Sequence, residues 1–311
     1  MSEGQGTKKR SVWGAVGLSL LMPGLGHAYC GKLSICIIIM IWSLIITPVF
    51  AAAFAGGRFL LAEVLFIVVV LVDIAIVIEA GLRAKRLDSG YQLKRCNSWK
   101  VYILLLIIGL GFYNLERKLV RINLVEIFDI PTISNYPTFI PGDRLAANKL
   151  VYKCETPKRG DLAVIISPED SGIYFVKRII AVAGDRVEIK DNDVFVNGQE
   201  LEREKVSYGD LNGIKVGFQG VPLAGDVYYE TNGEVRYKIF LADVQYDEKK
   251  DSFEKITVAP NQYFVLGDNR NMSRDSRHFG CVEQDKIIAR ADYICWPAKD
   301  WSRFGVINGE K

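Results

Sequence analysis

The chain has 311 residues, enough for one or two domains with a hydrophobic core, and 50% of its residues are hydrophobic. Its formal net charge is only +3, and it shows no lysine and arginine patch interleaved with aromatic residues, which argues against a nucleic-acid-binding protein. The six cysteines and two histidines show neither C-x-x-C pairs nor ligand-like spacing, so no metal site is predicted.

The hydrophobic excess lies in the first 115 residues. Residues 33–55 and about 59–81 are each long enough to cross a bilayer, and a third apolar run begins at Val101. The apolar stretch 11–29 is broken by Pro23-Gly24-Leu25-Gly26, which favours a re-entrant or interfacial hairpin over a span. A cleaved signal peptide is a poor interpretation of this N-terminus, because hydrophobic spans follow at once.

These runs predict the organisation of the N-terminal half. We expect a cytoplasmic N-terminus and hairpin over residues 1–32 and a membrane domain over 33–120 with about three transmembrane helices. Basic residues crowd the loop 82–100, whereas the link between the first two spans carries only Arg58. The positive-inside rule places that loop in the cytoplasm and residues 121–311 outside.

Two polar residues lie within the apolar part. Asp73 falls inside the second expected span, and an acidic residue at membrane depth is a candidate functional group by default. We favour a structural explanation for Asp73, either a hydrogen bond to a neighbouring helix or a position nearer the interface. His27, in the hairpin, is open to the same two interpretations.

From about residue 125 the sequence changes to short β-type runs separated by turns. Asn197-Gly198 and Gly267-Asp268-Asn269 are turn signals of the kind that joins strands, and helical periodicity is nearly absent. We therefore predict an all-β domain, with two sheets folded against each other as one arrangement. The strands are expected at Leu162–Ser167, Gly172–Ala181, Arg186–Lys190, Asp193–Val196, Asp226–Glu230, Glu234–Leu241 and Gln262–Leu266. Cys154, Cys281 and Cys295 lie in this half, where disulfide pairing stays open.

Three segments of this half carry candidate chemistry. Ser134 lies between prolines 131, 137 and 141, which limit helix formation and fix a turn or extended backbone. Lys177 lies in the run Tyr174–Ile180, where alternation places Phe175 and Ile179 on its own face. The third segment, Gly267 to Arg277, reads GDNRNMSRDSR.

A serine needs a base to take its proton. The histidine that could serve in the polar half is His278, so a Ser-His-Asp arrangement would depend on it. A lysine serves instead if burial lowers its pKa towards neutrality, and the apolar neighbours of Lys177 supply that environment. Arg178 cannot replace it, because a guanidinium stays charged.

These three segments, in this order behind membrane spans, resemble type I signal peptidases, the bacterial Ser/Lys proteases that remove secretory signal peptides. The resemblance runs from about residue 125 to about 297. It implies an N-terminal set of transmembrane helices followed by an extracytoplasmic β catalytic domain, with a smaller variable β subdomain inserted at about 199–258. It also implies a place in the bacterial cytoplasmic membrane and signal peptides as partners, with no cofactor.

The resemblance also implies roles for individual residues. Ser134 falls on the nucleophile, and Thr132 falls on the hydroxyl residue that forms the oxyanion hole with the Ser134 N–H. Lys177 falls on the general base, and Ser273 would orient its amine. Asp275 and Arg277, with Asp268 and Arg270, would form supporting ion pairs. Asn135 replaces the usual methionine after the nucleophile and Ile133 the usual small residue before it, which puts the shape of the substrate cleft in doubt.

Other interpretations compete with this one. Ser252-Phe253-Glu254-Lys255 matches the S-x-x-K pattern of penicillin-binding enzymes, but the chain lacks the S-D-N and K-T-G partners. A non-catalytic membrane protein on the same scaffold could bind exported segments without cutting them, although it would have no chemical reason to keep both Ser134 and Lys177. A soluble self-cleaving repressor is excluded by the spans. We therefore predict a membrane-anchored serine endopeptidase that contacts the lipid bilayer and signal peptides.

Overall fold

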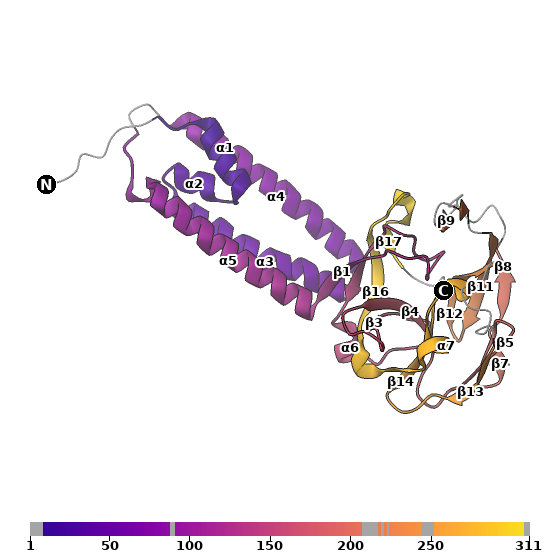
Figure 1. Ribbon diagram of the computed structural model, residues 1–311. Coiled ribbons are helices and arrows are strands. Elements are labelled where there is room, and N and C mark those ends of the chain that lie inside the picture. Colours follow the sequence, from indigo (N-terminus) through magenta and orange to yellow (C-terminus); the bar gives the residue numbers. More distant parts are fainter. Residues whose placement is uncertain are drawn as a thin grey trace. The chain divides into compact units, whose positions relative to one another are not determined.

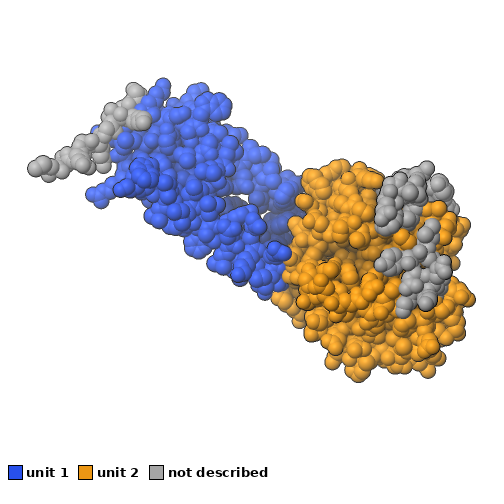
Figure 2. Space-filling model, viewed as in Figure 1, with its two compact units in different colours: residues 1–124 blue, residues 125–311 orange. Residues whose placement is uncertain are grey.

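A computed structural model describes residues 9–87, 91–206, 217–218, 221–222, 224–243 and 252–307. It divides the chain into two compact units, residues 1–124 and 125–311, coloured separately in Figure 2. The first unit is helical, and the second is built from strands with only short helices in its described part (Figure 1).

In its described residues, the helical unit contains two short helices and three long ones. They are α1 (Val12–Leu21), α2 (Leu25–Tyr29), α3 (Leu33–Ala55), α4 (Phe59–Arg86) and α5 (Trp99–Asn123), with a 3₁₀ turn η1 (Arg95–Asn97) before α5. Gly24 turns the chain between α1 and α2 with a φ of 92°, and a Cβ there would lie 2.9 Å from the Cys36 carbonyl oxygen. Only glycine fits that close approach without strain. The broken apolar stretch 11–29 thus forms a helical hairpin against α3 and α4.

Within the described residues, α3 and α4 are the helices long and apolar enough to cross a membrane. Large apolar side chains on them stay exposed, among them Ile38, Leu60, Phe66 and Leu71. A soluble unit rarely exposes so contiguous an apolar surface, whereas lipid covers it without cost. The third expected span lies in α5, which continues as one helix past Tyr113. The figure of about three spans stays a prediction.

The second unit is organised around an eight-stranded antiparallel sheet. Its order is β1-β2-β16-β3-β4-β14-β15, with β17 paired to β16. The strands are β1 (Val125–Asp129), β2 (Arg144–Asn148), β3 (Leu162–Ile166), β4 (Tyr174–Ala181), β14 (Gln262–Leu266), β15 (Val282–Glu283), β16 (Ile287–Trp296) and β17 (Gly305–Val306). Short helices α6 (Val151–Cys154) and α7 (Ser276–Phe279) and the 3₁₀ turns η4 (Arg270–Met272), η5 (Gln284–Lys286) and η6 (Trp301–Arg303) lie between them.

The described part of this unit also contains three smaller sheets, in the orders β13-β5-β6-β7, β12-β11-β8 and β10-β9. Their strands are β5 (Arg186–Lys190), β6 (Asp193–Val196), β7 (Gln199–Glu200), β8 (Arg203–Lys205), β9 (Gly217–Phe218), β10 (Val221–Pro222), β11 (Gly225–Asn232), β12 (Val235–Ala242) and β13 (Phe253–Thr257). The expected boundary at residue 199 falls between β6 and β7, which pair with each other. Residues before and after that boundary therefore share one sheet.

The predicted fold class is confirmed: apolar helices precede a β domain. The strands expected at Arg186–Lys190, Asp193–Val196 and Gln262–Leu266 occur with those bounds, and Asn197 and Gly198 turn with φ of 56° and 84°. β4 begins at Tyr174, two residues later than expected, because Gly172 belongs to the preceding turn. Strands β1, β2 and β16 were not predicted.

The pairing of β4 positions the site. In the described ladders, β3 pairs with β4 over Tyr174–Arg178, whereas β14 pairs with it at Arg178, Ile179 and Ala181. The first half of β4, which includes Lys177, is therefore a sheet edge on the side of β14. The loop that carries Ser134 packs beside this edge, as the hydrogen bonds below show.

Candidate active site

Ser134 lies in the long loop between β1 and β2. Short turns fold this loop, with hydrogen bonds from the Tyr136 N–H to the Ile133 carbonyl (3.0 Å) and from the Phe139 N–H to the Asn135 carbonyl (2.9 Å). Ser134 is half-buried, and its hydroxyl oxygen lies 3.2 Å from that of Thr132, which is exposed. The prolines that bracket the loop thus hold a serine hydroxyl at the surface of a rigid turn.

Lys177 is almost fully buried, with 2% of its surface exposed. Its amine donates a hydrogen bond to the Ser273 hydroxyl at 3.0 Å and lies 5.6 Å from the ring centre of Phe175. Burial lowers the pKa of the Lys177 amine to about 8, although the Asp275 carboxylate acts in the opposite direction. A large share of the amine is therefore neutral in mildly alkaline solution.

The Gly267 segment brings these groups together. A Cβ at Gly267 would lie 2.4 Å from the Ser134 carbonyl oxygen and 2.2 Å from the Ser273 hydroxyl oxygen. Only glycine leaves room for that approach. The Asn269 N–H then donates to the Ser134 carbonyl at 3.1 Å. The segment therefore contacts the serine loop and the lysine partner at once.

One cleft of about 850 Å³ contains the three groups Thr132, Ser134 and Lys177 in its lining. Most of the other lining side chains are apolar, including Phe128, Ile133, Ile173, Tyr174, Phe175 and Met272. A serine hydroxyl and a buried amine that share an apolar cleft are the groups that acyl transfer requires.

The family model described as "Signal peptidase, peptidase S26" matches residues 99–296. The chain belongs to this signal peptidase family. It is 29% identical over 248 residues to signal peptidase I of Rickettsia bellii (strain OSU 85-389), covering 71% of this chain and 81% of the relative. It is 32% identical over 180 residues to signal peptidase I T of Bacillus subtilis (strain 168), covering 58% and 78%.

A solved structure, the signal peptidase I from Enterococcus faecalis V583, is 28% identical and covers 44% of this chain and 97% of its own, with a TM-score of 0.26. The resemblance to bacterial type I signal peptidases is confirmed by the family match and the relatives. The chain is thus a signal peptidase of the S26 family, a class of hydrolase that acts on signal peptides.

Three buried ion pairs lie behind the site of this signal peptidase: Arg277–Asp275, Arg178–Asp268 and Arg270–Glu230. Arg277 binds the Asp275 carboxylate at 2.8 Å, and the Gly267 N–H donates to the same carboxylate at 3.0 Å. Burial alone would raise the pKa of Asp275, but the charges of Arg277 and Lys177 lower it below its usual value. Asp275 therefore stays ionised and fixes the Gly267 turn against α7.

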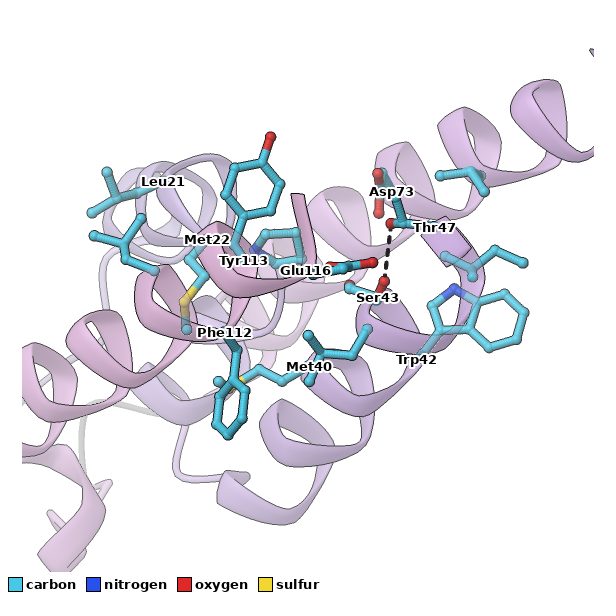
Figure 3. A pocket seen from close by; sticks show the side chains of 16 residues that line it. Leu21, Met22, Met40, Trp42, Ser43, Thr47, Asp73, Phe112, Tyr113 and Glu116 are labelled. Atoms are coloured by element: carbon cyan, nitrogen blue, oxygen red, sulfur yellow. Dashed lines mark hydrogen bonds between the residues drawn. The ribbon is translucent and has the colours of Figure 1, made fainter. Parts of the chain in front are cut away.

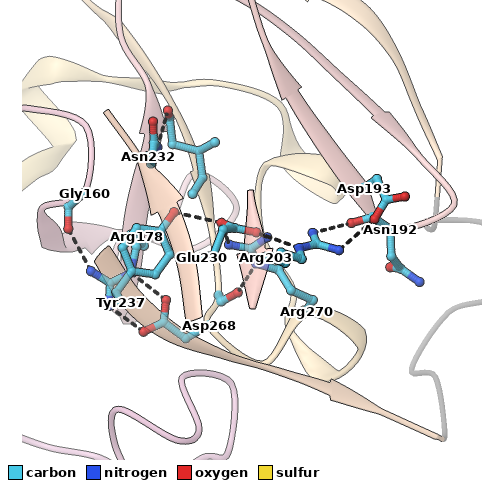
Figure 4. Close-up of polar contacts among 12 residues, drawn as sticks. Gly160, Arg178, Asn192, Asp193, Arg203, Glu230, Asn232, Tyr237, Asp268 and Arg270 are labelled. Carbon is cyan, nitrogen blue, oxygen red and sulfur yellow. Dashed lines mark hydrogen bonds and ion pairs between the residues drawn. The ribbon is translucent and has the colours of Figure 1, made fainter. Parts of the chain in front are cut away.

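Asp268 and Arg270 do not bind each other. The Arg178 guanidinium donates to the two carboxylate oxygens of Asp268 at 2.7 and 2.6 Å, while Arg270 binds Glu230 of β11 (Figure 4). Glu230 also accepts hydrogen bonds from Arg203 at 3.0 Å and from the Tyr237 hydroxyl at 2.8 Å. The sheet β12-β11-β8 is thereby joined to the Gly267 segment by a largely buried charge network, whose central members Arg270 and Glu230 are fully buried.

Sequence reasoning missed several members of this network, Arg178 and Glu230 among them. Arg178 could have been found, because alternation places it on the face of β4 opposite Lys177. Glu230 had no local signal, because it lies 40 residues from Arg270 in the segment expected to be variable. Only the tertiary fold shows that pair.

The two alternative catalytic arrangements considered above, a Ser-His-Asp arrangement that uses His278 and the S-x-x-K pattern at Ser252, do not form active sites in the structure. His278 lies against its own segment, with its Nδ1 3.4 Å from the Asp275 main-chain nitrogen and 4.0 Å from the Asp275 carboxylate. Ser252 precedes strand β13 rather than starting a helix, and both Ser252 and Lys255 are exposed. Neither arrangement resembles an activated nucleophile.

Asp73 and His27, the two polar residues singled out in the apolar part of the sequence, both lie in the helical unit. Asp73 lines a mainly apolar cavity of about 330 Å³ together with Thr47 and Glu116 (Figure 3). His27 is buried and bonded to Glu79, which also binds Arg83. Among the described residues no group of three or more metal-ligating side chains occurs, and the six cysteines are free thiols.

Proposed function

We propose that this signal peptidase is a membrane-anchored serine endopeptidase in which Ser134 is the nucleophile and Lys177 the general base. The observation that carries the proposal is the Lys177 amine, which is buried, is bonded to a hydroxyl and has a lowered pKa. Lys177 lines the same cleft as Ser134. Its substrates would be the N-terminal signal peptides of exported preproteins.

In the first step the neutral Lys177 amine accepts the proton of the Ser134 hydroxyl while the oxygen attacks the scissile carbonyl. The carbonyl oxygen becomes an oxyanion, for which the Ser134 N–H and the Thr132 hydroxyl are the proposed donors. Two such donors commonly stabilise a transition state by about 3–4 kcal/mol each.

In the second step the protonated amine gives its proton to the leaving nitrogen, and the peptide bond breaks to leave an ester on Ser134. A water molecule then attacks the ester, with the Lys177 amine again as the base, and the serine hydroxyl is restored. Ser273 would hold the amine in line throughout, because its hydroxyl can accept from the charged amine and donate to the neutral one.

Purified protein incubated with a preprotein tests this proposal, with the new N-terminus read by sequencing. Cleavage by the wild type, with none by Ser134→Ala or Lys177→Met at equal amounts of folded protein, is the expected result. A folded, membrane-inserted wild type that leaves every preprotein intact would support the non-catalytic alternative instead.

Substrate choice is proposed from the family. We expect cleavage after a small residue, with a second small residue two positions earlier, as in Ala-x-Ala signals. Placing phenylalanine immediately before the scissile bond should abolish cleavage. Efficient cleavage there would show that Ile133 and its neighbours leave a wider pocket than the proposal allows.

Topology is proposed from the basic loop 82–100. We expect this loop, with Cys96, in the cytoplasm and residues 122–311 outside the inner membrane of a bacterium. Protease added to intact spheroplasts should digest the β unit. A thiol-reactive probe that cannot cross the membrane should label Cys96 only after lysis.

A further inference from the structure

Asn135 occupies the position where the family pattern has methionine, directly after Ser134. It is buried, with 3% of its surface exposed, and both ends of its side-chain amide are bonded to main-chain groups. Its Nδ2 donates to the Val176 carbonyl at 2.6 Å, and its Oδ1 accepts from the Asp268 N–H at 3.3 Å. Methionine can donate no hydrogen bond and accepts only weakly.

Both partners are next to catalytic segments. Val176 precedes Lys177 in the half of β4 that β14 does not pair, and Asp268 follows Gly267. Asn135 thus joins the serine loop to the lysine strand and to the Gly267 segment. The Lys177–Ser273 and Asn269–Ser134 hydrogen bonds close a ring of contacts around the site.

We propose that Asn135 is a positioning residue of this peptidase: its amide holds the edge of β4 against the serine loop and so sets where the Lys177 amine stands relative to the Ser134 hydroxyl. This inference rests on the proposed Ser134 and Lys177 mechanism. We call the two hydrogen bonds that join the Asn135 amide to the Val176 carbonyl and the Asp268 N–H the tether. A methionine cannot form it.

The effect of Asn135 on the amine is geometric, because an amide is neutral at every relevant pH. The charged groups that face Lys177 are Asp275, Arg277 and Asp268, all from the Gly267 segment, and Asn135 variants with neutral side chains leave all three in place. If β4 moves away from the serine loop, water reaches the amine, and its pKa rises towards the ordinary lysine value. Turnover then falls and its pH dependence moves to higher pH.

Two substitutions with neutral side chains test the tether. Asn135→Ala removes both hydrogen bonds, and Asn135→Met installs the side chain of the family pattern. Each should lower kcat by about 10- to 100-fold, the cost of misplacing a catalytic group by about 1 Å, while KM stays within about twofold. The rising limb of the pH–kcat profile should move up by about half a pH unit or more.

Asn232 provides the matched control. It is equally buried, with 1% of its surface exposed, and its Nδ2 donates to the Ile180 carbonyl of the same strand at 2.9 Å. Asn232→Ala should lower Tm as much as Asn135→Ala does, but it should leave kcat and the pH profile unchanged. Equal kinetic effects of the two alanine variants would reduce Asn135 to a structural role and overturn the proposal.

A titration of the Lys177 amine separates this inference from the proposed function. Protein labelled with ¹³C at lysine Cε and studied by NMR in detergent micelles reports the amine pKa without substrate, with Lys177→Met used to assign the signal. A higher pKa in Asn135→Ala and Asn135→Met supports the tether. An unchanged pKa, or an Asn135→Met variant with wild-type kcat, overturns it. Absence of cleavage by the wild type would instead count against the proposed function.

Discussion

Lys177 and Arg178 are neighbours in β4 and are buried to the same degree, with 2% and 3% of their surfaces exposed. They point to opposite faces of the strand. Burial lowers the pKa of Lys177 to about 8, because its hydrogen-bond partner is the uncharged Ser273 hydroxyl. Burial would also lower the pKa of Arg178, but the Asp268 carboxylate bound to it raises the pKa instead.

The difference shows that burial alone does not make a base. Burial disfavours a positive charge, and a carboxylate in direct contact offsets that cost. One face of β4 therefore holds a proton acceptor, and the other holds a permanent ion pair that fixes the strand. Variants that change the charged group on either face test the comparison most directly.

The largest effect, on kcat/KM, is expected from substitution of Lys177. Lys177→Met and Lys177→Arg should each lower kcat/KM by about 10⁶-fold, as loss of the base of a serine protease does, since a guanidinium cannot accept the Ser134 proton. Rates of preprotein cleavage at matched amounts of folded protein provide the measurement. His278→Ala should keep most of its activity. A dead His278→Ala together with an active Lys177→Met would refute the Ser/Lys mechanism.

On the opposite face of β4, removal of the Asp268 charge beside Arg178 should lower stability. Asp268→Asn leaves the Arg178 guanidinium buried without a compensating charge and should lower the free energy of unfolding by about 3–5 kcal/mol. Urea denaturation of the detergent-solubilised protein measures it. The exposed pair Arg274–Glu169 is the control, because breaking it with Glu169→Gln should cost less than about 1 kcal/mol. Equal costs for the two variants would remove the contrast between buried and exposed pairs.

The cost of burying Lys177 should depend on pH. The pKa of Lys177 falls from 10.5 to about 8 on folding, so the unfolded chain binds this proton more tightly between those values, and stability rises with pH across that window. The wild type should gain about 3 kcal/mol relative to Lys177→Met between pH 8 and pH 10.5. Urea titrations of both proteins at several pH values test this. A constant difference would mean that Lys177 titrates as an ordinary lysine.

The smallest effect concerns activity near neutral pH. Because the reaction needs the neutral amine, kcat/KM should rise about tenfold per pH unit below the Lys177 pKa and level off above about 8. A pH–rate profile with a short fluorogenic signal-sequence peptide measures it. A profile that is flat from pH 6 to pH 9 would indicate that a group other than Lys177 accepts the proton.

Much of this protein could be predicted from local sequence. Apolar runs of about 20 residues mark α3 and α4, because the bilayer thickness fixes the length of a spanning helix. Turn residues such as Asn197 and Gly198 mark strand ends, because few residues adopt positive φ. The three segments around Ser134, Lys177 and Gly267 identified the family, because that chemistry restricts the residue types at each position.

Other features were decided only by the tertiary structure. The bonds of Asn135 to Val176 and Asp268, and the pairing of Arg270 with Glu230, join residues 41, 133 and 40 positions apart. Sequence periodicity cannot predict such contacts, because they form only when segments far apart in the chain come together in the fold. The sequence by itself therefore determined which groups can react, through residue type and strand alternation. The fold determined which of them are desolvated, which are neutralised and which are held in place, because those properties depend on what packs around each side chain.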